Sequence, residues 1–289
     1  MIDSDQQSLN ASHCVVLLDN GSLRAETTLR LRALAVELST RLGVEIFPVS
    51  ARHSNKVSPT ELNGVAAEVW EHFVDSKLEL GKRHFVILPL FFGSSGLLVD
   101  YIPRIFKKSS SDYSDACIEF APTLVDVDKP DDGLAAIIVS LIRKKLDTID
   151  ESRISQILLI DHGSPLMRVT RCRDIVANQV GEVFKRKGMD VMACSMERRN
   201  GEEYSFSDPL LENLLNDDFV KRESEILLAR LFLFPGRHAS PGGDIDQIIE
   251  NSEWSKNGGI VHQTELVGQH PDLVSLLEEN YYADRISID

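Results

Sequence analysis

The sequence predicts an α/β protein made of two similar lobes, each a mostly parallel sheet with helices on both faces. Two observations lead to this prediction. Short apolar runs alternate along the chain with segments of helical periodicity, and the pattern of the first half recurs about 142 residues later. Strands that alternate with helices are typical of parallel sheets covered by helices on both sides.

The recurrence is clearest at the first apolar run of each half. Residues 14–22 read CVVLLDNGS and residues 157–164 read ILLIDHGS. Both are typical of a buried strand that runs into a turn, and they place Asn20 opposite His162. Three further pairs follow in the same order: 85–97 with 228–238, 123–126 with 265–268, and 47–54 with 192–199. The order indicates a tandem duplication, with lobes over 1–148 and 149–289.

Helical periodicity fills the segments between the apolar runs. Apolar residues recur at spacings of three and four over 27–42, 62–78, 133–146, 169–187 and 210–231. In a parallel sheet of this kind, ligands bind beyond the carboxyl ends of the strands. Polar residues that directly follow the apolar runs are therefore the candidates for function.

Composition excludes several classes of protein. The chain has 289 residues, 43% of them hydrophobic, which suffices for two packed domains or one large one. Its net charge of −14 argues against a general nucleic-acid partner, which needs a basic face. The first residues lack a signal-peptide pattern, and no apolar run reaches the roughly 20 residues of a membrane helix. We expect a cytoplasmic monomer or homodimer with no membrane partner, and reduced thiols at Cys14, Cys117, Cys172 and Cys194.

Three polar residues follow apolar runs of the second half: His162, Glu197 and His238. Two imidazoles and a carboxylate suit a divalent metal such as iron or cobalt. They can also accept protons near neutral pH. In the first half Asn20, Leu97 and, less closely, Arg52 occupy the corresponding positions. We therefore expect one site per chain, in the second lobe.

Other features are given a structural interpretation. His262 and His270 are expected to serve structure, although they could be additional metal ligands. Ser164 is not expected to be a nucleophile, because the G-x-S-x-G pattern is missing around it. The polar stretch within 196–215 is either a lid or a loop that leads into a helix.

Taken together, these segments resemble a known family. LLIDHGSP, RCRDIVANQVGEVF, LFLFPGRHASPGGDI and TELVGQHPDL, with VILPLFFGSSGLLVDYIP and APTLVDVDKP in the first half, are similar to the CbiX/SirB-type sirohydrochlorin chelatases, the class II chelatases. The resemblance covers nearly the whole chain. It implies two chelatase-like lobes with a tetrapyrrole cleft between them. It also implies insertion of Co²⁺ or Fe²⁺, or Ni²⁺ in some branches, into sirohydrochlorin without ATP or an organic cofactor. The implied pathway is cobalamin or siroheme biosynthesis.

The resemblance also implies residue roles. His162 and His238 correspond to the active-site histidines and metal ligands, and Glu197 to the acidic helper. The tetrapyrrole periphery carries carboxylates, for which arginine is the better bidentate partner. Candidates for substrate binding flank the three turns, with Arg237 foremost, followed by Arg168, Arg171, Arg198, Arg199 and Ser164.

The chain departs from many long members of this family in two ways. Its histidine pair lies in the second half, and the loop after His238 is longer. Two other functions therefore stay open. One is a non-catalytic tetrapyrrole- or metal-binding protein derived from a chelatase. The other is a two-lobed binding module for a different anionic ligand, in which the histidines are structural.

Overall fold

The computed structural model describes residues 13–216 and 225–288, which divide into two compact units. Unit 1 comprises residues 13–124 and 274–288, and unit 2 comprises residues 125–273. Each unit holds one sheet, and the strand orders are β2-β1-β3-β4-β9 in unit 1 and β6-β5-β7-β8 in unit 2. All strand pairs are parallel except β4 with β9. The predicted fold class is confirmed.

Unit 1 is built from five strands and four helices among its described residues. Its strands are β1 (His13–Asp19), β2 (Ile46–Ser50), β3 (His84–Pro89), β4 (Cys117–Phe120) and β9 (Ile286–Ile288). Its helices are α2 (Ala25–Leu42), α3 (Trp70–Glu79), α4 (Ile102–Ser109) and all but the first two residues of α10 (Asp272–Tyr282).

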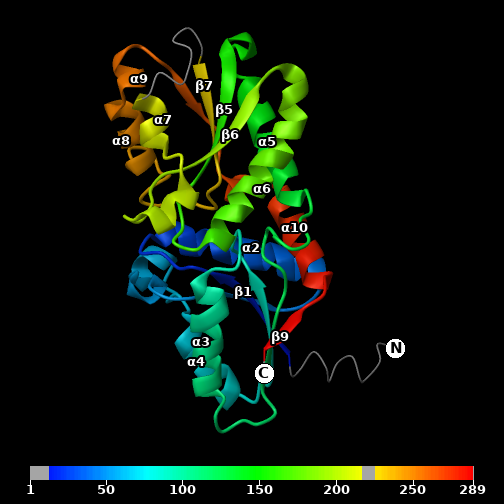
Figure 1. Cartoon of the computed structure of the whole chain (residues 1–289). Helices are drawn as coiled ribbons and strands as arrows, with labels where there is room; N and C mark the ends of the chain where they lie inside the picture. Colours follow the sequence, from blue (N-terminus) through cyan, green and yellow to red (C-terminus); the bar gives the residue numbers. More distant parts are fainter. Residues whose placement is uncertain (1–12, 217–224, 289) are drawn as a thin grey trace. The chain divides into compact units, whose positions relative to one another are not determined.

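Unit 2 repeats this plan. Its strands are β5 (Ile154–Asp161), β6 (Asp190–Ser195), β7 (Glu225–Arg230) and β8 (Val261–Gln263). Its helices in the described part are α5 (Gly133–Leu146), α6 (Met167–Phe184), α7 (Leu211–Asn216), α8 (Asp244–Asn251) and α9 (Glu253–Lys256). Figure 1 shows α7, α8 and α9 on one side of β5 and β7, and α5 and α6 on the other.

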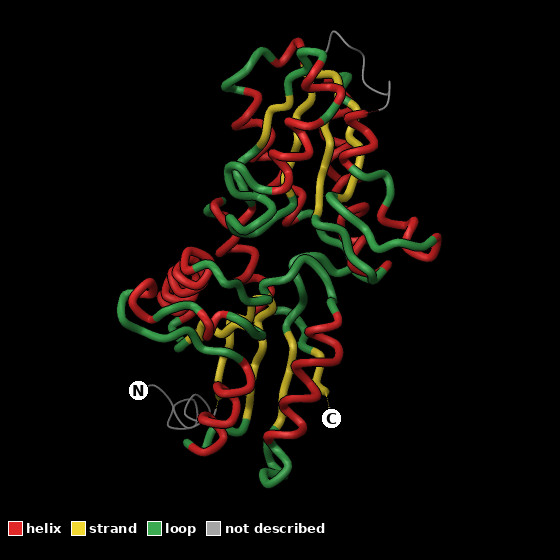
Figure 2. Tube along the Cα trace, turned by 90° about the vertical axis from the view of Figure 1, so that its left-hand side faces the viewer, coloured by secondary structure: helices red, strands yellow, loops and turns green. Residues whose placement is uncertain are grey.

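Strands β1, β3, β5 and β7 are buried on both faces, which explains why they appear as unbroken apolar runs. In unit 1, Val16 and Leu18 of β1 pack with Trp70 and Phe106 of α3 and α4. Alternate residues of unit 2 behave likewise: Leu158 and Ile160 of β5 pack with residues of α7, α8 and α9. Helices flank the strands of each unit in Figure 2. Burial on this scale is the main force that holds each unit together.

Two predicted helices differ from the structure. The segment 62–78 contains a 3₁₀ turn that ends at Leu62, and α3 begins only at Trp70. Asn63 and Gly64 between them have positive φ angles of 58° and 84°, which end a right-handed helix. The helix predicted over 210–231 is wrong at its end, because residues 225–230 form the buried strand β7. Residues 217–224 of that prediction lie outside the described residues.

The boundary between the units does not coincide with the lobe boundary predicted at 148/149. Helix α5 comes from the first half of the sequence but packs against α6 and β7 in unit 2. In return, the segment 274–288 belongs to unit 1, where Asn280 donates hydrogen bonds to the carbonyl oxygens of Pro122 and Thr123. Each half of the sequence thus contributes its last helix to the unit formed mainly by the other half.

The four cysteines are free thiols, as predicted. In the described part of the chain, no helix combines the length and apolar character needed to cross a membrane.

Candidate active site

The three candidate residues of the second half come together at the carboxyl ends of β5, β6 and β7. His162 follows the last residue of β5, and its ring centroid lies 4.6 Å from that of His238, with the two rings at 70°. The His162 Nε2 atom lies 3.6 Å from Glu197 Oε1. Parallel strands end at one edge of a sheet, which is why residues 162, 197 and 238 can meet.

A glycine makes the close approach of His162 and Glu197 possible. Gly163 has a φ of +91°, and a Cβ atom there would overlap the carbonyl oxygen of Glu197. The Glu197 amide donates to the His162 carbonyl oxygen at 3.2 Å, and the Met196 amide donates to the Asp161 carbonyl oxygen at 2.9 Å. The two loops therefore run in backbone contact, which brings the two side chains to the same place.

The hydrogen bonds of both imidazoles fix which nitrogen is available. His162 Nδ1 lies 3.0 Å from the Gly163 carbonyl oxygen, which can only accept a hydrogen bond. His238 Nδ1 lies 2.7 Å from the Asp244 carboxylate. Each neutral ring therefore carries its proton on Nδ1 and presents an Nε2 lone pair. Both lone pairs can hold a metal ion or accept a proton.

Asp244 was not singled out from the sequence. It is the first residue of α8, where the positive end of the helix dipole favours a carboxylate. A carboxylate behind a histidine orients the ring and raises its basicity toward a metal. Within the described residues, no group of three or more His, Cys, Asp or Glu side chains is arranged to enclose a metal ion.

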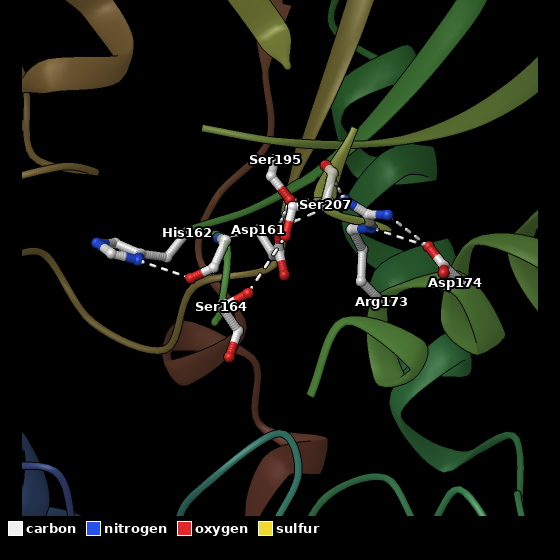
Figure 3. A network of polar contacts seen from close by, with 8 residues as sticks. Asp161, His162, Ser164, Arg173, Asp174, Ser195 and Ser207 are labelled. Atoms are coloured by element: carbon white, nitrogen blue, oxygen red, sulfur yellow. Dashed lines mark hydrogen bonds and ion pairs between the residues drawn. The ribbon is translucent and has the colours of Figure 1, made fainter. Parts of the chain in front are cut away.

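A buried polar network lies beneath His162 and was also missed. Asp161 Oδ1 accepts hydrogen bonds from Gly163 N at 3.0 Å and from Ser195 Oγ at 2.6 Å. Ser195 Oγ in turn accepts from Arg173 Nη1 at 2.6 Å. Figure 3 shows the His162 ring and the Arg173 guanidinium on opposite sides of Asp161. Burial raises the pKa of Asp161, while the Ser195 hydrogen bond and the Arg173 charge oppose that rise.

Comparison with known proteins identifies the fold. No protein-family model and no curated protein matches the sequence. Among solved structures, SirB from Bacillus subtilis with Fe³⁺ aligns with a TM-score of 0.65 at 15% identity, over 93% of this chain and 94% of that one. SirB from the subspecies spizizenii, in complex with cobalt, aligns with a TM-score of 0.62 at 15% identity, over 93% of each chain. CbiX, described as the terminal enzyme for biosynthesis of siroheme in denitrifying bacteria, aligns at 0.59 and 15% identity, over 93% and 97%.

The fold is that of the sirohydrochlorin chelatases. Within this chelatase fold, unit 1 repeats the turn of unit 2 without its histidines. Gly21 has a φ of +89°, and a Cβ atom there would overlap the carbonyl oxygen of Arg52, as one at Gly163 would overlap that of Glu197. Asn20 and Arg52 thus stand where His162 and Glu197 stand. Leu97, which the sequence places opposite His238, packs against the apolar core of unit 1.

The arginines expected to bind substrate in the chelatase fold differ in their surroundings. Arg237 is 80% exposed, with Nε 3.3 Å from Asp244 Oδ2, and Arg171 is exposed. Arg198 is held within its own loop by Asp208, at 2.9 Å, and by the Gly201 carbonyl oxygen.

Three further candidates also have partners. The Arg199 guanidinium lies 5.9 Å from the centre of the Tyr204 ring, and Arg168 forms an ion pair with Asp128. Ser164 Oγ accepts a hydrogen bond from the Leu166 amide at 3.1 Å. Arg237 and Arg171 therefore have the guanidinium groups that a ligand could engage with least rearrangement.

The two histidines interpreted as structural have partners away from this site. His262 Nε2 lies 2.5 Å from Glu225 Oε2. Glu225 is the first residue of β7, so this pair lies at the amino end of that strand, whereas the candidate site follows the carboxyl ends. His270 Nε2 lies 2.9 Å from Ser140 Oγ of α5. The polar stretch 196–215 forms a loop with a 3₁₀ segment and leads into α7.

Proposed function

We propose that the protein is a metal chelatase that inserts Co²⁺ or Fe²⁺ into sirohydrochlorin or a closely related tetrapyrrole without ATP. The observation that carries this proposal is the apposition of His162, His238 and Glu197 at the carboxyl edge of a chelatase-type sheet. The metal ion is a substrate of this reaction. The similar structures with iron and cobalt support the proposal through their fold.

The geometry suggests a division of labour between the histidines. His238, backed by Asp244 at 2.7 Å, is the better donor toward a metal ion and receives it through Nε2. His162 has its Nε2 beside Glu197, so this pair accepts the protons of the pyrrole nitrogens. The free-base macrocycle loses two N–H protons as the divalent ion enters, so the charge of the macrocycle with its metal equals that of the free base.

Binding of the macrocycle needs local positive charge, because the whole chain carries a net charge of −14. Arg237 is next to His238, Arg171 lies in the second turn of α6, the helix that follows His162, and both are exposed. We assign them, with Arg198, Arg199 and Ser164, to the carboxylates of the tetrapyrrole. Binding energy from this periphery can distort the ring and expose its nitrogen lone pairs.

The deciding experiment is an anaerobic absorbance time course with sirohydrochlorin and Co²⁺, then Fe²⁺, against a control without protein. We expect wild type to accelerate metal insertion, and His162→Ala and His238→Ala each to lose that acceleration. Asn20→Ala, at the equivalent turn of unit 1, should keep it.

Two results would contradict this proposal. A spectral shift of bound tetrapyrrole without acceleration in wild type would indicate a non-catalytic carrier. Equal activity in all three variants would show that the histidines of unit 2 are not the site.

A further inference from the structure

Arg173 is a buried arginine on the apolar face of α6. Its side chain is 3% exposed, each of its three nitrogens donates a hydrogen bond, and Nη1 also lies 3.9 Å from Asp161 Oδ1. Nη1 donates to Ser195 Oγ at 2.6 Å and to the Ser207 carbonyl oxygen at 3.0 Å, while Nε and Nη2 donate to Asp174 at 2.9 and 2.7 Å. A buried guanidinium is costly to desolvate, so its presence calls for a reason beyond helix packing.

Unit 1 shows that the fold does not need an arginine there. Helices α2 and α6 both have 18 residues, and Leu31 occupies in α2 the position that Arg173 occupies in α6. Leu31 is 1% exposed. The strands beneath these helices match as well, because Asp19 pairs with Ser50 in unit 1 as Asp161 pairs with Ser195 in unit 2. The arginine therefore belongs to the unit that carries the histidines, and not to the repeated scaffold.

The hydrogen bonds of Arg173 connect it to the turn that carries His162 and to the loop that carries Glu197. Through Ser195 it reaches Asp161, whose carboxylate holds the amide of Gly163, the residue that follows His162. Ser195 itself is the last residue of β6, two residues before Glu197 on the loop that contacts His162.

The remaining bond of Arg173 extends this support to the turn after His162. Arg173 holds the Ser207 carbonyl group, and the Ser207 hydroxyl donates to the Ser164 carbonyl oxygen at 3.3 Å. The Arg173 side chain is thus hydrogen-bonded, directly or through one serine, to both loops that carry the proposed proton acceptors His162 and Glu197.

We propose that Arg173 is a positioning residue, which holds the Asp161–Gly163 turn and the loop after Ser195 so that His162 stays beside Glu197. This inference rests on the proposed function, because it assigns Arg173 to the proton-transfer half of the site. Metal capture by His238 does not depend on it, since His238 is oriented by Asp244 from α8.

The test replaces Arg173 by the residue that unit 1 uses. In Arg173→Leu, kcat for metal insertion should fall about tenfold to a hundredfold. This is the usual effect of removing a residue that orients the groups of a site through hydrogen bonds. The KM for tetrapyrrole and the Co²⁺ affinity that depends on His238 should stay near the wild-type values. Arg173→Lys should recover part of kcat, because an ammonium can still donate to Ser195.

A matched control removes a structural arginine from unit 1. Arg32 of α2 donates to the carbonyl oxygens of Leu62, Val65 and Ala66. Arg32→Leu should therefore lower the thermal unfolding temperature without changing kcat. If Arg173→Leu does not fold, Ser195→Ala removes the hydroxyl that links Arg173 to Asp161 and should lower kcat by a smaller factor, because the 3.9 Å ion pair of Arg173 with Asp161 remains.

A second measurement separates this inference from the proposed function. The imidazole ¹H–¹⁵N signals of His162, assigned with His162→Ala, should shift in Arg173→Leu and stay in place in Arg32→Leu. Unchanged signals and unchanged kcat in a folded Arg173→Leu would overturn the inference. If wild type showed no insertion while the His162 signals still moved, the proposed function would fail and the positioning role would stand.

Discussion

A buried carboxylate ends the first strand of each sheet, and its surroundings differ between the two units. Asp161 lies within a network that includes Arg173, whereas Asp19 has Leu31 on the helix above it. The Asp19 Oδ1 atom has no hydrogen-bond partner among the described residues. Burial raises the pKa of Asp19 to about 6 from an ordinary value of 3.8. The same residue at the same place in the fold thus has two electrostatic environments.

This difference predicts a pH dependence of stability for unit 1. Between about pH 4 and pH 6 the folded state holds a proton on Asp19 that the unfolded state has released, so the free energy of unfolding falls as pH rises. Above that window the cost of the buried charge is constant, about 3 kcal/mol for two pKa units. Asp19→Asn should therefore stabilise the protein near pH 7 and have little effect at pH 4. Urea unfolding at both pH values measures this, and equal effects at both would contradict it.

Single residues were only partly predictable from the sequence. His162, His238 and Glu197 could be identified because each follows an apolar run, and strand ends meet in a parallel sheet. Asp244 could not, because it comes after an irregular loop whose path the hydrophobic pattern does not encode. Arg173 does leave a signal in the sequence, because it is a charged residue at an apolar position of a helical stripe that includes Val169, Cys172 and Val176. A buried charge of this kind has to be paired, so it points to a network.

At the scale of elements, the strand-to-glycine turn is the part that the duplication has kept. Gly21 and Gly163 share a positive φ and the same close approach to a neighbouring carbonyl group. The segments around them have diverged, since one carries Asn20 and Arg52 and the other His162 and Glu197. The turn is therefore a requirement of the fold, and the side chains placed on it determine whether a unit has a site.

This view predicts a matched pair of glycine variants. Gly21→Ala and Gly163→Ala should each lower the free energy of unfolding by about 1–3 kcal/mol or more, because alanine is strained at this φ and its Cβ overlaps a carbonyl oxygen. Only Gly163→Ala should also lower metal insertion, since it displaces Glu197. Denaturant unfolding and the absorbance assay test the pair. An equal loss of activity in both variants would argue against a site confined to unit 2.

Helices and strands were predictable where the apolar residues of a segment follow one periodicity from end to end. The helix expected over 133–146 matches α5, and the one expected over 27–42 begins only two residues earlier. The prediction over 210–231 failed at β7 because a strand buried on both faces has the same apolar content as a buried helix. Strand β9 left no signal, since its three residues are exposed.

At the scale of the whole molecule, duplication has produced two units with one candidate site. Unit 1 offers no histidine at the turns that hold His162 and His238 in unit 2. We therefore predict that Co²⁺ titrates one histidine-dependent equivalent per chain, measured by calorimetry on wild type and His238→Ala. Asn20→Ala should give the wild-type stoichiometry. Two strong equivalents that both survive His238→Ala would indicate that the metal binds elsewhere.

The tandem arrangement was predictable from the recurring motifs, but the composition of the compact units was not. Periodicity shows that α5 and α10 each have an apolar face, but it does not say which sheet that face covers. The repeat predicts two lobes over 1–148 and 149–289. The structure instead assigns α5 to unit 2 and the segment 274–288 to unit 1.

This exchange of terminal helices has a consequence for how the fold assembles. If the two halves were separate polypeptides, each unit would need a helix from another molecule, and its formation would depend on protein concentration. In a single chain, the packing of α5 into unit 2 and the packing of residues 274–288 into unit 1 are both intramolecular. Each then benefits from the high effective concentration that a covalent link provides. Strand β1 of unit 1 leaves the ribosome before any strand of unit 2, but unit 1 also needs residues 274–288, so it can be completed only after all of unit 2 has been synthesised.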